Sequence, residues 1–183
     1  MKNVSEYPSG SVEDRAMLVG ISADKLLDYF FLQIRNLWRV DGLYFLGIEK
    51  KFGTEAASEI DAGVWETMAG IEAKSLQKMF SVGENSEIVT IMDLLQKSSW
   101  ALDQPFKTIT VSKEKAVLGI DRCRTQETRL SKGLDEFPCK KVRSGYLEKF
   151  AKTLNPKVKV NCIVCPPDKH PKDKWCKWEF VLG

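Results

Sequence analysis

Cysteine is the residue type whose placement in this sequence points most directly to chemistry. Cys162 and Cys165 form a C-x-x-C pair, Cys176 follows after a short loop, and Cys139 lies in a Phe-Pro-Cys turn. Structural zinc takes four thiolate or imidazole ligands in a tetrahedron, and a C-x-x-C turn suits two of them. A structural zinc clip would therefore combine Cys162, Cys165 and Cys176 with His170, the single histidine.

The same cysteines allow other interpretations. His170 lies in the loop between Cys165 and Cys176, and Cys139 or Cys123 could complete the ligand set. Cysteine is also a common small core residue, so simple packing explains the pattern as well. A redox pair fits less well, because redox C-x-x-C motifs usually open a helix and this one follows a predicted strand.

Established catalytic motifs are absent from the sequence. It contains no G-x-S-x-G elbow, no glycine-rich phosphate loop, no H-E-x-x-H and no dinucleotide fingerprint. A Cys–His nucleophilic pair would need His170, which lies in a loop rich in proline and lysine. The sequence therefore assigns no catalytic residue.

Two groups of polar residues are candidates for a binding site. In the first, Arg35 and Asp41 alternate with apolar residues of a long helix, so Arg35 could form a buried pair with Asp61 or Glu72. An ordinary helix-packing salt bridge is the favoured explanation. The second group surrounds Cys123 and could hold an anion, although such a group is more often a solvated loop. Its members are Arg122, Arg124, Gln126, Glu127 and Arg129.

Composition excludes several classes of protein. The 183 residues suffice for one domain, and the net charge of +3 comes from 28 basic and 25 acidic residues that are well mixed. This mixing argues against a nucleic-acid partner. No apolar run is long enough for a membrane span or a secretory leader, and the five cysteines are an odd number, so we expect a cytoplasmic protein without a disulfide framework.

The elements that must position these residues follow from hydrophobic periodicity. Residues 1–20 show little periodicity and predict a loose N-terminal arm, followed by a single domain over 21–183. Spacings of three and four over 21–104 predict a helical half, with one helix interrupted near Asp41-Gly42 and ended by Gly53. The period changes to two after Pro105. Residues 105–183 predict a β-rich half with strands near 106–111, 116–120, 158–164 and 176–182 and a helix over 145–154.

Three segments carry a resemblance to known families. They are Arg35-Asn36-x-Trp38-x-x-Asp41-Gly42-x-Tyr44-Phe45, the stretch from Arg129 through Glu136-Phe137-Pro138-Cys139-Lys140, and Cys162-x-x-Cys165-Pro166-Pro167-Asp168-x-His170-Pro171 through Trp178-Glu179-Phe180. Together they resemble a family of small uncharacterised prokaryotic proteins that is distantly similar to the L-2-amino-thiazoline-4-carboxylate hydrolases. The last hairpin is similar to the end of vinyl-4-reductase-type ligand-binding domains.

The resemblance implies a vinyl-4-reductase-like α+β fold, in which the helical half packs on a C-terminal antiparallel sheet around a small-molecule pocket. We expect Arg35, Trp38, Asp41 and Arg129 to line that pocket. The residue-by-residue match implies that Cys139, Cys162, Cys165 and Cys176 are the ligands of a zinc ion that pins the sheet. The alternative hypothesis is a small hydrolase that opens a C–N or C–S bond of a heterocycle. Its nucleophile would be Cys123 or Cys139, with Glu127 or Glu136 nearby. A third interpretation is a homodimer that uses the aromatic first helix (Tyr29, Phe30, Phe31, Trp38, Tyr44, Phe45) as its contact surface.

Overall fold

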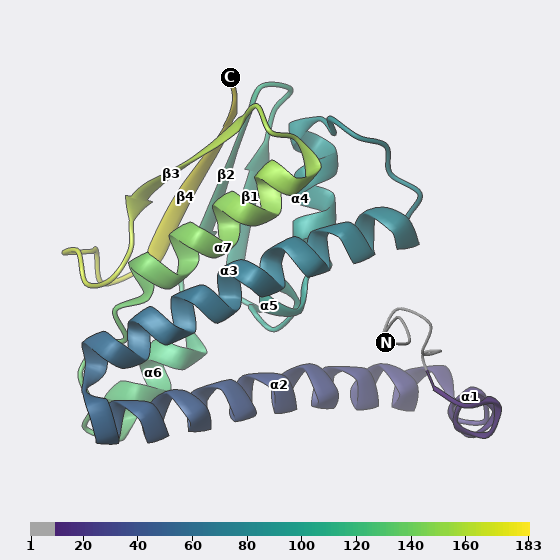
Figure 1. The fold of residues 1–183 in the computed structure, drawn as a ribbon, viewed down its shortest axis with the longest axis horizontal. Coiled ribbons are helices and arrows are strands. Elements are labelled where there is room, and N and C mark those ends of the chain that lie inside the picture. The colour runs from purple at the N-terminus through teal and green to yellow at the C-terminus, as the bar shows by residue number, and fades with distance from the viewer. Residues whose placement is uncertain (1–9) are drawn as a thin grey trace, which may run out of the picture. The chain divides into compact units, whose positions relative to one another are not determined.

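The chain separates into two compact units, Met1–Val40 and Asp41–Gly183, in a computed structural model that describes residues 10–183 (Figure 1). In the first unit a short helix, α1 (Val12–Val19), lies where the sequence suggested an arm; residues 1–9 of that arm lie outside the described residues. Ser11 accepts a hydrogen bond from the Asp14 backbone N–H, and the Asp14 carboxylate accepts one from the Ser11 N–H. This reciprocal capping box fixes the start of α1.

Helix α2 (Ala23–Phe52) is continuous, so the predicted break near Asp41-Gly42 is wrong. Apolar and charged side chains keep helical spacing through this stretch, and one glycine costs a helix only about 1 kcal/mol. The helix ends at Gly53, as predicted, and α3 (Thr54–Met79) begins at the next residue. Gly53 has φ 88° and ψ 164°, a conformation that is essentially restricted to glycine.

Replacing Gly53 by alanine is therefore expected to lower the free energy of unfolding by about 1–3 kcal/mol, because a Cβ atom strains this backbone conformation. Urea denaturation measures the change. Gly63→Ala is the matched control: Gly63 lies inside α3 with open space around the Cβ position, so alanine there should stabilise by about 0.5–1 kcal/mol. Equal effects at the two positions would contradict the assignment of strain to Gly53.

Four antiparallel strands form one sheet in the order β1-β2-β4-β3. They are β1 (Lys107–Val111), β2 (Lys115–Ile120), β3 (Val158–Val164) and β4 (Cys176–Leu182). Leu118 pairs with Trp178 and Ile120 with Cys176, so the buried residues of β2 and β4 share one face. This face is the floor of the core. The predicted α+β class, a helical first half and a C-terminal antiparallel sheet, is confirmed.

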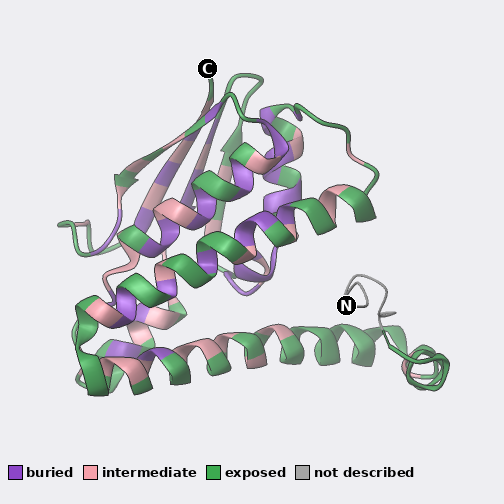
Figure 2. Cartoon of the chain, in the orientation of Figure 1, coloured by how far each residue is buried: buried purple, intermediate pink, exposed green. Residues whose placement is uncertain are grey.

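Helices cover this floor (Figures 1 and 2). The helices that contact its strands are α4 (Ile88–Gln96) and α7 (Cys139–Leu154). The larger unit also contains the short α5 (Ser99–Leu102) and α6 (Arg124–Ser131). Helix α7 packs on β3 and along α3, where Gly70 and Gly145 allow close approach: a Cβ atom at Gly70 would lie 3.2 Å from Lys149 Cε. Among the described residues, none of the helices has the length and apolar content to cross a membrane.

Two of these helices differ from the sequence-based expectations. Helix α6 occupies the stretch beside Cys123 that resembled a solvated loop, and its Gln126 and Arg129 side chains are buried. Helix α7 begins at Cys139 rather than near Gly145. The earlier start matters, because it places Cys139 and Arg143 on the same helix as the core aromatics.

Candidate functional site

One face of α7 brings together the buried polar groups of the larger unit. Cys139, Arg143, Tyr146 and Phe150 recur at spacings of four, three and four, which places them on one side of the helix. Arg143, Tyr146 and Phe150 are all buried. Because this face points into the core, Arg143 and the Tyr146 hydroxyl must find their partners there.

Three aromatic rings surround the Arg143 guanidinium, which is only 3% exposed. Its Cζ atom lies 4.7 Å from the centroid of the Trp65 ring, 5.2 Å from Trp100 and 5.4 Å from Tyr146. A cation enclosed by ring faces gains cation–π attraction of roughly 2 kcal/mol per desolvated contact. This arrangement, which we call the arginine cage, joins α3, α5 and α7.

Two carboxyl groups lie beside the cage. Trp65 Nε1 donates a hydrogen bond of 3.1 Å to Asp41 Oδ1, and Asp61 shares a hydrogen bond with Asp41. Burial and the neighbouring Asp41 charge raise the pKa of Asp61 to about 7, against the opposing attraction of Arg143. Burial raises the pKa of Asp41 as well. Below about pH 7 the pair therefore keeps the Asp61 proton, as close carboxyl pairs do.

A third carboxylate ties the cage to its neighbours. Glu72 Oε2 accepts a hydrogen bond of 2.8 Å from the Tyr146 hydroxyl, and Glu72 Oε1 accepts one of 2.7 Å from the Ser99 backbone N–H. The Tyr146 ring is thereby fixed in orientation against Trp65, at 5.6 Å between centroids. Glu72 thus holds α3, α5 and α7 in one arrangement.

Three thiols continue this polar chain toward the sheet. Cys165, which follows β3, interacts through thiol hydrogen bonds with Cys139 and with Cys176. The Cys165 hydrogen bond and the nearby Arg143 lower the pKa of Cys139, in spite of its burial. The Lys140 backbone N–H donates to the Pro166 carbonyl at 2.8 Å, which holds the start of α7 against the end of β3. We call Cys139, Cys165 and Cys176 the thiol cluster.

The other two cysteines lie beside the thiol cluster. Cys123 is near Cys139 and Cys176, and burial raises the pKa of its thiol to about 12. Cys162 pairs with Trp178 rather than with Cys176, so it lies next to the predicted position, half-buried and close to Lys140 and Asp168. His170 lies against Trp175, 4.7 Å between ring centroids, and its Nε2 lies 3.4 Å from Glu136.

The donor chemistry of the thiol cluster suits zinc, because three thiols from three elements converge and two more lie nearby. Within residues 10–183, however, no set of three or more His, Cys, Asp or Glu side chains already has the geometry that holds a metal ion. The thiols are therefore ligands of the type that zinc prefers, but a tetrahedral zinc site would require them to move closer together.

The residues that the sequence suggested for a ligand fall in different places. Arg35 and Trp38 belong to the unit Met1–Val40, and Asp41 and Arg129 belong to the other. Asp41 is part of the carboxyl pair. Arg129 binds Glu49 through two hydrogen bonds of 3.0 and 2.9 Å, and so joins α6 to the end of α2.

Sequence reasoning missed the central residue of the site, Arg143. Had the helix been extended back to Cys139, the spacing of Cys139, Arg143, Tyr146 and Phe150 would have marked Arg143 as a buried cation. Asp61 was named only as a partner for Arg35, whereas in the structure it lies close to Arg143.

An open groove of about 1100 Å³ lies between α3 and α7 on the larger unit. Its walls carry glycines and charged side chains such as Glu66, Lys74 and Lys149. These charges are solvated, so the groove offers no desolvated group with which to select a ligand. The buried polar chain is the stronger candidate.

The carboxyl pair predicts how stability depends on pH. The folded protein keeps the Asp61 proton up to about pH 7, whereas the unfolded chain releases it near pH 4. The folded state therefore binds more protons between these values, and the free energy of unfolding should fall as pH rises through this window. Asp61→Asn should remove the fall, gaining roughly 1–3 kcal/mol at pH 8 and much less at pH 4. Urea unfolding at the two pH values measures this.

Asp93→Asn is the control for that experiment, because Asp93 is an exposed carboxylate paired with Lys97 four residues on. Its replacement should change stability by less than about 0.5 kcal/mol at either pH. If the free energy of unfolding of Asp61→Asn still falls from pH 4 to pH 8 as it does in the parent, then Asp61 is ionised in the folded protein.

Comparison with known proteins gives a family and a fold. The model of a family described as a family of unknown function (DUF6125) matches residues 19–182. No curated protein matches the sequence. Among solved structures, the phenol-responsive sensory domain of the transcription activator PoxR, crystallised with phenol, is similar with a TM-score of 0.50 at 13% identity. The match covers 79% of this chain and 73% of that one, and at this identity it shows a shared fold.

Proposed function

This chain belongs to DUF6125, a family of unknown function, and we propose that it is a small-molecule-binding domain whose ligand reaches the core between the arginine cage and the sheet. The observation that carries the proposal is the buried polar chain itself. Burying a guanidinium and a carboxyl pair in a domain core is costly, and such groups with shifted pKa values cluster at functional sites. The likeness of the fold to a sensory domain solved with phenol supports the same conclusion.

Two buried polar atoms indicate what kind of molecule would fit. The Trp178 Nε1–H, on the inner face of β4, and the Gln104 side-chain oxygen have no hydrogen-bond partner among the described residues. An unsatisfied buried group costs about 1–3 kcal/mol, which a ligand atom would recover. A hydroxyl group can accept from the first atom or donate to the second. We infer a small aromatic ligand with a hydroxyl group, like the phenol with which the similar sensory domain was solved.

Titration of the full chain with phenol, followed by calorimetry, tests this proposal. The Trp178→Phe variant removes the indole N–H donor together with part of the ring, and we expect it to bind phenol at least about fivefold more weakly, since one hydrogen bond contributes about 1 kcal/mol. Trp175→Phe is the control, because Trp175 packs on His170 away from the core. Its affinity should equal that of the parent.

The same titration with substituted phenols of increasing size and with cyclohexanol tests the whole ligand class and not phenol alone. Saturable binding that weakens in Trp178→Phe and not in Trp175→Phe supports the proposal. The absence of saturable binding across the panel would overturn it, and binding that is unaffected by Trp178→Phe would exclude the site.

We also propose that the thiol cluster holds a structural zinc ion. Cys139, Cys165 and Cys176 would be three ligands, with Cys162 or Cys123 as the fourth. Support comes from the convergence of three thiols and from the lowered pKa of Cys139, which favours the thiolate that a metal needs. Such an ion would join the start of α7 to β3 and β4 and would leave no open position for catalysis.

The hydrolase hypothesis has less support. Burial raises the pKa of Cys123 to about 12, so its thiol is protonated and a weak nucleophile at neutral pH. Glu127, the nearest predicted base, accepts two hydrogen bonds from Arg122, and Glu136 lies beside His170. Neither carboxylate contacts a cysteine among the interactions of the described residues.

A further inference from the structure

Lys107, the first residue of β1, is a half-buried cation outside the arginine cage and the thiol cluster. It pairs with Ile120 on β2, and Ile120 in turn pairs with Cys176 on β4. Side chains of directly paired residues lie on the same side of a sheet. Lys107 therefore shares the inner face with two buried residues and stands at the edge of the floor of the core.

The Lys107 ammonium has no acidic partner. Its Nζ atom donates a hydrogen bond of 3.3 Å to the Gln104 carbonyl, and within residues 10–183 it takes part in none of the ion pairs. Helix α4, which contacts β1, buries only apolar side chains. Burial accordingly lowers the pKa of Lys107. Because an ammonium has three N–H donors, Lys107 keeps hydrogen-bonding capacity for an anionic group.

The unpartnered indole N–H of Trp178 belongs to the same face of the sheet. Trp178 lies two residues beyond Cys176 on β4, so its side chain is on the inner side, opposite Leu118. Strands about 4.8 Å apart and a rise of about 3.3 Å per residue place the Cα atoms of Lys107 and Trp178 roughly 12 Å apart. Two long side chains at this separation can hold opposite ends of one aromatic ring.

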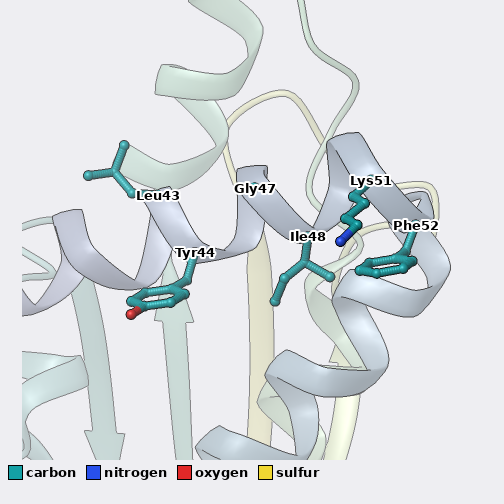
Figure 3. A pocket seen from close by; sticks show the side chains of 6 residues that line it. All are labelled: Leu43, Tyr44, Gly47, Ile48, Lys51 and Phe52. Atoms are coloured by element: carbon teal, nitrogen blue, oxygen red, sulfur yellow. The ribbon is translucent and has the colours of Figure 1, made fainter.

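The lysines of the surface hollows differ from Lys107 in their exposure. Lys51 lines a hollow of about 340 Å³ on α2, where its ammonium lies 5.1 Å from the centroid of the Phe52 ring, and both residues are exposed (Figure 3). Lys74 and Lys149, in the groove between α3 and α7, are exposed as well. Water and salt weaken the attraction of such solvated cations for an anion, whereas partial burial strengthens that of Lys107.

We propose that the ligand is an aromatic acid whose carboxylate binds the Lys107 ammonium and whose hydroxyl group binds the Trp178 indole N–H. This inference rests on the ligand site proposed above and adds the charge of the ligand. One half-buried cation matches one negative charge, which favours a carboxylate over a phosphate group with a charge near −2. A phenolic hydroxyl is neutral at pH 7, so charge distinguishes the two ends of the molecule.

Calorimetric titration of the full chain with para-hydroxybenzoate and with para-hydroxybenzamide, its neutral amide of similar shape, tests the inference. The parent should bind the carboxylate at least about tenfold more tightly, because hydrogen bonds between charged groups are the stronger ones. Lys107→Met removes the charge and keeps an apolar stem, so it should bind both compounds equally. Lys113→Met is the matched control: Lys113 is exposed in the turn between β1 and β2, and its variant should keep the preference of the parent.

Equal affinity of the parent for the two compounds would overturn this inference and leave the phenol site intact, because phenol has no carboxylate. A preference for the carboxylate that survives in Lys107→Met would overturn the assignment to Lys107. If neither compound binds and phenol does not bind either, the proposed ligand site is itself wrong and this inference fails with it. Thermal unfolding verifies that Lys107→Met is folded, and the comparison of the two compounds on the parent does not depend on that variant.

Discussion

Replacing Arg143 by methionine is expected to lower the free energy of unfolding by about 3–5 kcal/mol at pH 8, because it leaves Asp41 and Asp61 buried without their cation. Methionine keeps much of the packing volume inside the arginine cage, so the cost is mainly electrostatic. The cation–π contacts with Trp65, Trp100 and Tyr146 are lost as well. Urea denaturation measures the difference.

The pH dependence separates this cause from a simple cavity. Without Arg143 both carboxyls should hold their protons to higher pH, so the loss of stability should shrink as pH falls to 5. Adding Asp61→Asn to Arg143→Met should recover roughly half of the loss, since one buried charge is removed with its desolvation cost. A loss that is equal at pH 5 and pH 8 would assign it to packing instead.

Arg122→Met is the matched control for charge removal. Arg122 binds Glu127 through two hydrogen bonds on the surface, and exposed pairs contribute about 1 kcal/mol or less. If Arg122→Met and Arg143→Met were equally destabilising, the arginine cage would have no special role in the fold.

Hydrophobic period predicted most of the fold, for a physical reason. A strand with one buried face has apolar residues at every second position, and a helix with one buried stripe has them at every third or fourth. The four strands therefore lie close to the segments that this alternation predicted, at 107–111, 115–120, 158–164 and 176–182. Helix α6 could not be found in this way, because Arg124–Ser131 contains a single large apolar residue, Leu130, which is exposed. Its burial rests on Gln126, whose amide exchanges hydrogen bonds with the Phe137 backbone.

The candidate site was only partly visible in the sequence. Spacing along the chain identified Cys162, Cys165 and Cys176, because a hairpin brings strand positions together predictably. Cys162 pairs with Trp178 in the regular register, and the β-bulge after it shifts the pairing so that Val164 lies opposite Lys177. Beyond the bulge, Cys165 interacts with Cys176. The interaction between Cys139 and Cys165 depends on how α7 packs on β3, which no local pattern encodes. The arginine cage likewise draws its rings from α3, α5 and α7.

Replacing Cys165 by serine is expected to abolish zinc binding and to lower the midpoint of thermal unfolding by roughly 10 °C. Cys165 is the thiol that interacts with both Cys139 and Cys176, so its loss divides the cluster, and serine is a poor ligand for zinc. Elemental analysis of the freshly purified parent should give about one zinc per chain. A chelator should lower its thermal midpoint toward that of the variant.

Cys162→Ser and Cys123→Ser, prepared in parallel, identify the fourth ligand, because one should lose zinc affinity and the other should keep it. Both thiols are half-buried, but burial raises the pKa of Cys123 to about 12, whereas Cys162 lies beside Lys140, whose positive charge favours a thiolate. We therefore expect Cys162→Ser to release the metal and Cys123→Ser to retain it. The zinc proposal would be wrong if the purified parent contained no metal and its five thiols stayed protected until the chain unfolded. The thiol cluster would then be part of the apolar core. The small-molecule proposal would rest on the arginine cage alone.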